Sequence, residues 1–333
     1  MDMMEAIYQK AKANPKIVAF PEVEEEKILQ AALECKEKGY CTPLLVAKKT
    51  DIAASAEKFG LDLSRLDVFD CENESEIDSL AEAYFEKTQR NSVKSMKRKS
   101  KDSMYVALML EEMGKADAVF AGMSHSTGDV IWAGEMVIGL KEGVTTASSI
   151  GVADIPGYEG PEGNLLIFGD SAVCANPDSE DLASIAISGC DTAKELLGWE
   201  PRCALLSFST CGSAENELVD KVREAVKIAN ERRPDYKIDG EFQFDAATVP
   251  AVAAKKVKRD SPVAGKANIV IWPDLNAGNI GVKLIQQFGH ADAYGPVLQG
   301  FRKVVCDCSR SAPVSEVVGN VAIAVVRAQN SSN

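Results

Sequence analysis

A hydroxyl, a guanidinium and a carboxylate lie close together near the C-terminal end of the chain, in VVCDCSRSAPVSEVVG (residues 304–319). Ser309 and Arg310 follow a short apolar run, and Glu316 lies just inside an expected helix, residues 314–326. A guanidinium can hold two oxyanion oxygens, a hydroxyl can donate to developing negative charge, and a carboxylate can accept a proton. Together they predict chemistry on an anionic substrate; an acidic first helical turn that only complements the helix dipole is the alternative.

The elements that would position these residues alternate along the chain. Short apolar runs, such as KIVAF (16–20) and ADAVFAG (116–122), are separated by longer stretches with helical periodicity. Many of these runs end in Gly, Asp or Ser, a pattern typical of parallel strands that are covered on both faces. The sequence therefore predicts an α/β fold, and the Gly/Pro-rich stretch 151–164 indicates a domain boundary.

Four segments at the carboxyl ends of expected strands are rich in hydroxyl, Gly or Asn residues. They are AGMSHSTGD (121–129), SFSTCGSAE (207–215), WPDLNAGN (272–279) and DCSRS (307–311). In open parallel sheets, ligands bind beyond the carboxyl ends of the strands, and backbone N–H groups at helix starts favour anions. Four such loops in one chain predict an anion-binding cleft.

The charge balance argues against nucleic acid as a partner. The 333 residues include 37 Lys and Arg against 50 Asp and Glu, which gives a net charge of −13. One basic run, KSMKRKSK (94–101), is either a solvated face or a patch for a phosphorylated ligand. No apolar stretch approaches the roughly 18 residues typical of a membrane span, so no membrane association is expected.

Cysteine and histidine usage predicts neither disulfides nor a metal site. The nine cysteines are odd in number and scattered without a CxxC pair, which favours free thiols in a reducing cytoplasm. There are two histidines, of which His125 in MSHST is either a base or a packed side chain. No GxGxxG follows a strand, AGKAN (264–268) lacks the rest of a phosphate loop, and GxSxG is absent.

Several longer motifs carry a family resemblance. SFSTCGSAENELVDKV, GKANIVIWPDLNAGNIGVK and DCSRS, in this order, resemble the phosphate acetyl/butyryltransferase family, and the similarity extends from about Lys16 to Ala328. The resemblance implies a two-domain, three-layer αβα fold with mainly parallel sheets, like that of isocitrate and isopropylmalate dehydrogenases. It implies one domain of residues 1–148 plus 303–333, an inserted domain of residues 149–302 that dimerises, and an active-site cleft between them.

The resemblance also implies an activity: reversible acetyl transfer, acetyl-CoA + phosphate = acetyl phosphate + CoA. CoA, the acyl phosphate and phosphate are then the small-molecule partners, with no tightly bound cofactor and no metal. In the family's Ser–Arg motif and the acid after it, Ser309 would stabilise the oxyanion, Arg310 would hold phosphate, and Glu316 would take the thiol proton. The DCSRS match favours the acetyl branch over the butyryl branch.

Further candidate positions follow from the same resemblance and from the strand-end rule. The substrate-binding candidates are Thr127, Ser209, Thr210, Asn276, Tyr294 and Gln299. The candidates for the CoA phosphates are Arg90, Lys97, Arg98 and Lys99. Most of these residue types also serve as helix caps, loop braces or packed side chains, so each has a structural alternative.

Three positions depart from the family pattern. Trp132 and Gln287 stand where the family has Arg, and Glu316 stands where it has Asp. A lost charge-assisted hydrogen bond costs roughly 1.5–3 kcal/mol of affinity. These departures motivate an alternative: a family member with other acyl specificity, propionyl or butyryl, or one that has lost catalysis and binds a ligand or a protein.

Overall fold

The computed structural model describes residues 3–331, which form two compact units. One unit contains the chain up to Gly139 and from Phe301 onward; the other is Leu140–Gly300. The first division thus falls after Gly139, where the sequence suggests residue 148, and the second after Gly300, where it suggests residue 302. The Gly/Pro-rich stretch 151–164 instead contains the end of β5 (Ser148–Asp154) and the connection to the antiparallel strand β6 (Leu165–Gly169).

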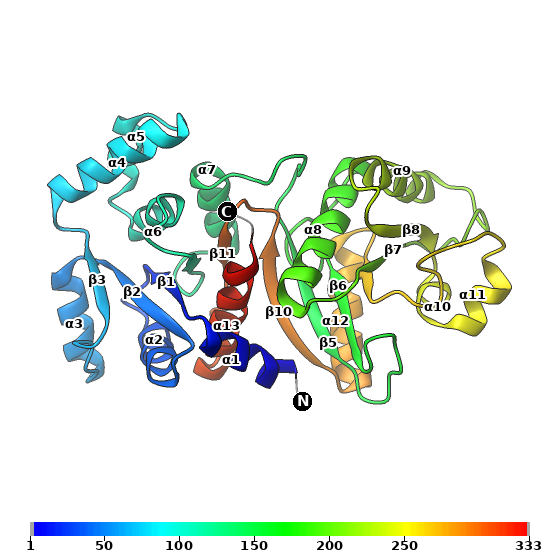
Figure 1. Ribbon diagram of the computed structural model, residues 1–333, viewed down its shortest axis with the longest axis horizontal. Coiled ribbons are helices and arrows are strands. Elements are labelled where there is room, and N and C mark those ends of the chain that lie inside the picture. The colour runs from blue at the N-terminus through cyan, green and yellow to red at the C-terminus, as the bar shows by residue number, and fades with distance from the viewer. Residues whose placement is uncertain (1–2, 332–333) are drawn as a thin grey trace. The chain divides into compact units, whose positions relative to one another are not determined.

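The first unit is built on a parallel five-stranded sheet in the order β11-β4-β1-β2-β3 (Figure 1). Its strands are β1 (Lys16–Phe20), β2 (Cys41–Ala47), β3 (Asp67–Asp70), β4 (Ala118–Phe120) and β11 (Val304–Cys306). Val18, Ala19 and Phe20 in β1 are fully buried, as expected for the centre of a sheet that is covered on both faces. The order reverses beside β1, so β1 and β4 flank the switch point where ligands bind in such sheets.

Helices cover both faces of this sheet. They are α1 (Met3–Ala13), α2 (Glu26–Lys38), α3 (Lys49–Phe59), α4 (Glu74–Thr88), α5 (Val93–Lys99), α6 (Ser103–Glu112), α7 (Thr127–Val137) and α13 (Val314–Asn330). α2 packs on α13 on one side, and α6 packs on α7 on the other (Figure 1). α13 buries nearly every residue from Val317 to Arg327, which anchors the C-terminal segment in this unit.

The second unit has a six-stranded sheet in the order β10-β5-β6-β9-β7-β8. Its strands are β5 (Ser148–Asp154), β6 (Leu165–Gly169), β7 (Arg202–Leu206), β8 (Lys237–Phe242), β9 (Ile269–Ile271) and β10 (Asp292–Gln299). β6, β9, β7 and β8 are parallel, whereas β5 runs antiparallel to both β10 and β6. The prediction of an α/β fold with mainly parallel sheets is confirmed.

The helices of the second unit are α8 (Ser179–Leu197), α9 (Glu217–Arg232), α10 (Phe244–Thr248), α11 (Pro250–Lys256) and α12 (Leu275–Gly289). α8 lies against β5, β6, β7, β9 and β10 and is buried along most of its length. Phe168 and Phe242 lie in an apolar cluster of this unit, against which Val282 and Ile285 of α12 pack. α12 therefore turns one apolar face toward the sheet.

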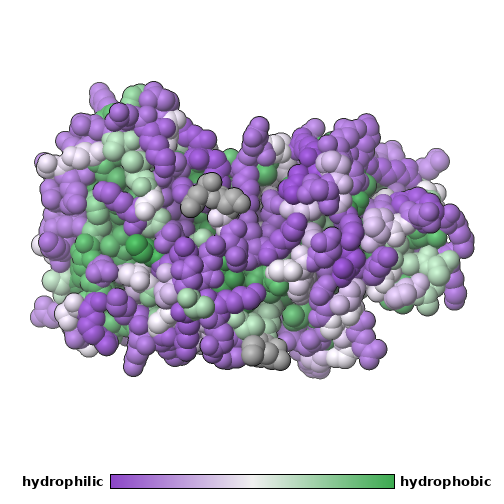
Figure 2. All heavy atoms as spheres, in the orientation of Figure 1, coloured by the Kyte–Doolittle hydropathy of each residue, from purple (hydrophilic) through white to green (hydrophobic). Residues whose placement is uncertain are grey.

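The outer surface is mostly polar on the face seen in Figure 2, with scattered apolar residues between. Between residues 3 and 331, none of the helices combines the length and the apolar character that a bilayer span requires.

Candidate active site

Two loops meet where β4 and β11 end. These strands pair in parallel, with Cys306 opposite Phe120, and the amide of Ala121 donates to the carbonyl of Cys306 at 3.1 Å. Because carboxyl ends of parallel strands share one edge of the sheet, residues 121–127 and 307–312 lie side by side. We call this pair of segments the β4–β11 loop site.

A buried carboxylate joins the two loops. Asp307 is 4% exposed, and its Oδ2 accepts a hydrogen bond from Thr127 Oγ1 at 2.6 Å. Its Oδ1 is buried and has no hydrogen-bond partner among the described residues. Burial raises the pKa of Asp307 to about 6, against the smaller opposing effects of the Thr127 hydroxyl and the Cys308 amide.

The 121–127 loop is shaped by another buried carboxylate, Glu22, which follows β1. Its oxygens accept the backbone N–H groups of Gly122, Met123, Ser124 and His125 at 2.8–3.2 Å. Burial opposes ionisation of Glu22, but hydrogen bonds from His125 and from the amides outweigh it and lower the pKa of this carboxyl. An ionised carboxylate at the switch point thus holds the loop in place.

His125 is a clamp and not a base. Its Nδ1 lies 2.8 Å from Glu22 Oε1 and its Nε2 lies 3.3 Å from Asp102 Oδ2. Hydrogen bonds to Asp102 and then to Glu22 raise the pKa of His125 to about 10. The ring is therefore an imidazolium at neutral pH, with both nitrogens donating, and it cannot take a proton from a substrate.

Ser309, Arg310 and Glu316 all lie at this end of β11, and all three are exposed. Ser309 Oγ lies 2.9 Å from Ser311 Oγ and accepts the Ser311 amide at 3.3 Å. Glu316 occupies the first turn of α13, which begins after Pro313. Hydrogen bonds from Ser126 lower the pKa of Asp129, and the positive charges of His125 and Arg310 lower it further. The guanidinium of Arg310 therefore lies near the first turn of α7.

Thr127 belongs to the same site, but its chemistry differs from the expectation. The sequence suggests that Thr127 donates to a substrate, whereas its one hydroxyl proton is given to Asp307 in the structure. The oxygen can then only accept a hydrogen bond from a ligand.

Ser209 and Thr210 brace the loop after β7. Ser209 is fully buried and donates to Glu241 Oε1 at 2.8 Å. Thr210 is 4% exposed and accepts the amide of Gln243 at 2.9 Å. Glu241 also takes the amide of Gly212. A role in direct substrate binding is therefore not supported for either hydroxyl, since both are used within the loop.

Gln299 is a structural residue of the second unit. It is 1% exposed, its amide donates to Ser148 Oγ at 3.0 Å and to the carbonyl of Ile185, and its oxygen accepts from Thr192 Oγ1 at 3.1 Å. Every polar atom of this side chain has an internal partner, and substrate binding by Gln299 stays a prediction.

Asn276 is exposed on the first turn of α12.

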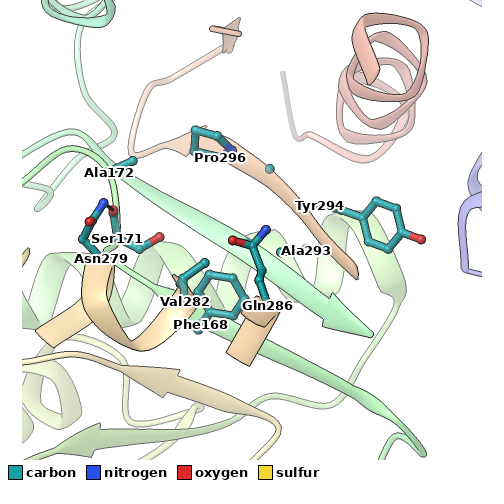
Figure 3. Close-up of a pocket in the computed structure, with 11 residues that line it drawn as sticks. Phe168, Ser171, Ala172, Asn279, Val282, Gln286, Ala293, Tyr294 and Pro296 are labelled. Carbon is teal, nitrogen blue, oxygen red and sulfur yellow. Dashed lines mark hydrogen bonds between the residues drawn. The ribbon is translucent and has the colours of Figure 1, made fainter. Parts of the chain in front are cut away.

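A hollow of about 200 Å³ lies between α12 and β10 in the second unit (Figure 3). Asn279, Val282 and Gln286 line it from the helix. Tyr294 borders it from β10, yet Figure 3 shows the tyrosine ring pointing away from Gln286. The strand alternates, so Ala293 and not the Tyr294 ring faces α12. Tyr294, a substrate-binding candidate, therefore does not direct its ring into this hollow.

Of the four candidates for the CoA phosphates, three have a partner within the protein and one is exposed. Arg90 Nη1 donates to the carbonyl of Ile138 and so fixes the end of α7. Lys97 pairs with Asp78 at 3.0 Å, and Lys99 donates to the Tyr105 hydroxyl at 3.1 Å. Arg98 is exposed.

A larger hollow, of about 550 Å³, lies at the carboxyl ends of β2 and β3 in the first unit. Lys97 is one of its lining residues, together with Lys48 and Lys101, which sequence reasoning did not select. Lys48 and Lys101 are exposed, and no ion pair joins either of them to another described residue. Lys48 directly follows β2, so the strand-end rule could have identified it.

The departures from the family pattern lie on the surface. Trp132 on α7 is 63% exposed, and Gln287 on α12 is also exposed.

Within residues 3–331, no group of three or more His, Cys, Asp or Glu side chains is arranged to hold a metal ion.

Comparisons with known proteins agree with this architecture. The family model described as phosphate acetyl/butaryl transferase matches residues 2–325. Phosphate acetyltransferase from Clostridium acetobutylicum is 40% identical over 331 residues, covering 99% of both chains, and the Bacillus subtilis enzyme is 37% identical, covering 98% of this chain and 99% of its own. A phosphotransacetylase structure from Streptococcus pyogenes superposes with a TM-score of 0.88 at 33% identity over 98% of each chain.

A more distant structure shows how far the fold extends. A 4-hydroxythreonine-4-phosphate dehydrogenase from Klebsiella pneumoniae, at 11% identity, superposes with a TM-score of 0.53 over 94% of this chain and 98% of its own. That likeness concerns the fold alone. The extent of the family match and the identity with its members show that this chain belongs to the phosphate acetyl/butaryl transferase family.

Proposed function

We propose that this protein is a phosphate acetyltransferase that moves an acetyl group between CoA and phosphate. The observation that carries the proposal is the exposed pair Ser309 and Arg310 at the carboxyl end of β11, beside the loop after β4. It occurs in a chain that is 40% identical, over nearly its whole length, to a phosphate acetyltransferase.

In the direction of acetyl-CoA synthesis, the CoA sulfur attacks the carbonyl carbon of acetyl phosphate. A C–S bond forms, the C–O bond to phosphate breaks, and the thiol proton must leave. Free thiols have a pKa of about 8.5, so a carboxylate within reach assists attack at neutral pH. Glu316 is our candidate for that carboxylate. Arg310 would hold the phosphate oxygens and Ser309 would donate to the oxyanion of the tetrahedral intermediate.

An acyl panel tests this function and its specificity. Purified protein is mixed with CoA and acetyl, propionyl or butyryl phosphate, and thioester formation is followed. We expect the highest kcat/KM with acetyl phosphate. Thioester formation from none of the three would contradict the transferase function, and a preference for butyryl phosphate would contradict the acetyl assignment.

For the phosphorylated end of CoA we propose the 550 Å³ hollow, whose charged lining residues are Lys48, Lys97, Lys101, Asp51, Glu74 and Asp78. Lys97 is already paired with Asp78, so the phosphate groups would be held by Lys48 and Lys101. The hollow lies three strands from β11 in the sheet order, about 14 Å at ~4.8 Å per strand, which the pantetheine arm of CoA can cover. Neither Lys48 nor Lys101 forms an ion pair with another residue between 3 and 331, so their charge is available to phosphate groups.

We further propose a homodimer formed through α12. Ile280, Leu284 and Phe288 are 57%, 49% and 80% exposed, and their spacing of four residues places them on one helical face. The opposite face, with Val282 and Ile285, already packs on the apolar cluster of the second unit. An exposed apolar row on a helix that has a second, buried face is typical of a protein interface.

A cytoplasmic location is also proposed. The nine cysteines are all free thiols in the structure, including the neighbouring Cys35 and Cys41, which interact by a hydrogen bond instead of a disulfide. Such thiols persist in a reducing compartment.

A further inference from the structure

The carboxylate of Asp307 has an unusual position for a group so near an exposed site. Asp307 stands two residues before Ser309, yet it is 4% exposed, and no cationic side chain within residues 3–331 forms an ion pair with it. Its one side-chain partner is Thr127, which is 180 residues away in sequence and begins α7. A single hydrogen bond therefore links the segment that carries Ser309 and Arg310 to the first turn of α7.

Gly122 shows how tightly the two loops meet. A Cβ on this glycine would lie 2.0 Å from Asp307 Oδ1 and 2.7 Å from the Cys308 amide nitrogen, and its φ is +106°. Only glycine allows so close an approach with this backbone conformation. The unpartnered Oδ1 of Asp307 is thus enclosed against the 121–127 loop, and Oδ2 carries the whole contact with Thr127.

We propose that Asp307 is a positioning residue of the transferase site, which in its ionised form ties the first turn of α7 to the loop that bears Ser309 and Arg310. The proposal rests on the function proposed above. Asp307 acts through Thr127 and the backbone of its own loop, not by touching the reacting atoms. It adds a residue that the candidate set of Ser309, Arg310 and Glu316 does not contain.

The length of the contact indicates why ionisation matters. An O–H···O distance of 2.6 Å is typical of a charge-assisted hydrogen bond, which is about twice as strong as a neutral one. Protonation of Asp307 would replace it by the weaker neutral form. Because burial raises the pKa of this carboxyl to about 6, the change falls at mildly acidic pH.

The titratable groups next to Asp307 are not expected to change charge near pH 6. Glu22, which precedes α2, adds negative charge that further raises the pKa of Asp307, and its own pKa is lowered by the amides and by His125. The thiols of Cys306 and Cys308 flank it in sequence, and burial raises the pKa of both well above neutrality. Asp307 is therefore the group expected to change charge in the β4–β11 loop site near pH 6.

The first test is the pH profile of kcat/KM for acetyl-CoA formation between pH 5 and 8.5. Asp307→Asn keeps the shape of the side chain but not its charge; we expect a rate lower by about tenfold at pH 7.5 and the loss of the acid limb near pH 6. Thr127→Val should show the same pattern, and Thr127→Ser, which keeps the hydroxyl, should recover the limb. Asp117→Asn is the matched control, because Asp117 caps the opposite end of the sheet by accepting the Ile17 amide.

A second readout does not depend on activity. Hydrogen exchange of residues 121–130, corrected for the intrinsic pH dependence, should be about tenfold faster in Thr127→Val than in the wild type at pH 7.5, because the buried carboxylate loses its one side-chain hydrogen bond. Because the pKa of Asp307 is raised, exchange in the wild type should slow as pH falls through about 6, and exchange in Asp307→Asn should not respond to pH in this range. If the wild type made no thioester but showed this exchange pattern, the proposed function would fail while the Asp307 contact stood.

Two results would overturn the proposal. One is an Asp307→Asn variant that keeps the wild-type rate and acid limb. The other is loop exchange that is equal in wild type and variant at every pH. If Asp307→Asn did not fold, Thr127→Val would decide the question, since the same two outcomes apply to it.

Discussion

Glu22 and His125 are joined twice: the carboxylate of Glu22 accepts the backbone amide of His125 at 3.0 Å and its Nδ1 at 2.8 Å. Glu22 follows the central strand β1, and His125 lies in the loop after β4, about a hundred residues later. The loop that presents Thr127 is therefore held from the switch point of the sheet. This scaffold is charged, and it holds the loop that leads to Thr127.

The His125 clamp predicts a pH-dependent stability on the alkaline side. The pKa of His125 is raised from 6.5 to about 10 in the folded protein. A raised pKa of a cationic group means that the clamp stabilises fully below pH 6.5 and that this contribution is lost as pH rises through about 10. Urea unfolding should thus show a large deficit for His125→Asn at pH 6 that narrows toward pH 10.

His290→Asn is the control for that experiment, because His290 is exposed at the C-terminal end of α12 in a left-handed conformation that Asn tolerates. It should change the free energy of unfolding little at any pH. A His125→Asn deficit that stays constant from pH 6 to pH 10 would show that the ring contributes packing and no charge.

Asp307 also has a raised pKa, and it predicts a pH-dependent stability on the acidic side. Its pKa is raised from 3.8 to about 6, so the folded state binds a proton more tightly than the unfolded state does. Stability from this group is greatest below pH 4 and falls as pH rises through about 6, by on the order of 3 kcal/mol in all. Relative to the wild type, Asp307→Asn should therefore gain stability between pH 4 and pH 7, measured by urea unfolding. A parallel pair of curves would contradict the raised pKa.

The main elements of the fold could be predicted from the sequence because the apolar runs end in small polar residues. KIVAF forms strand β1, as its apolar pattern predicts. Val304–Cys306 forms strand β11, which ends before the predicted loop that contains Ser309 and Arg310. The antiparallel strands β5 and β10 were not predicted, since period and composition do not reveal strand direction. The stretch between β5 and β6 suggested a linker for the same reason: Gly and Pro also make hairpin connections.

The site could be predicted only where function depends on local sequence. Ser309 and Arg310 follow a strand, and the structure places them at its exposed end. Gln299 could not be recognised as internal, because its partner Thr192 lies 107 residues away. Glu22 was missed because its role depends on amides about a hundred residues later. Asp307 carried a signal that was overlooked: an acid at a strand end, two residues before the Ser–Arg pair.

The lysine-lined hollow predicts an effect on CoA alone. Charge reversal in the double variant Lys48→Glu/Lys101→Glu should raise KM for CoA by about tenfold or more, with little change in kcat or in KM for acetyl phosphate. The effect should weaken at high salt, because exposed charges are screened. Steady-state kinetics with each substrate varied in turn measures this, and Lys115→Glu, exposed before β4, serves as the matched charge reversal. An unchanged KM for CoA would remove the hollow from the CoA site.

The α12 interface predicts a change of mass without a change of fold. Phe288→Glu places a charge in the exposed apolar row and should convert a dimer into a monomer in light scattering coupled to size exclusion. Lys283→Glu is the control on the same helix, since Lys283 is exposed but lies outside the row. A wild type that is monomeric at micromolar concentration, or a Phe288→Glu variant that remains a dimer, would refute this interface.

The central claim is that Arg310 holds the phosphate of the acyl donor while the acetyl group is transferred. The most direct measurement is the rate of acetyl-CoA formation from acetyl phosphate and CoA, compared for the wild type and Arg310→Ala after both have shown the same unfolding midpoint. We predict robust turnover in the wild type and a fall of at least about a hundredfold in kcat/KM for the variant. An Arg310→Ala protein that turned over like the wild type would contradict the assignment.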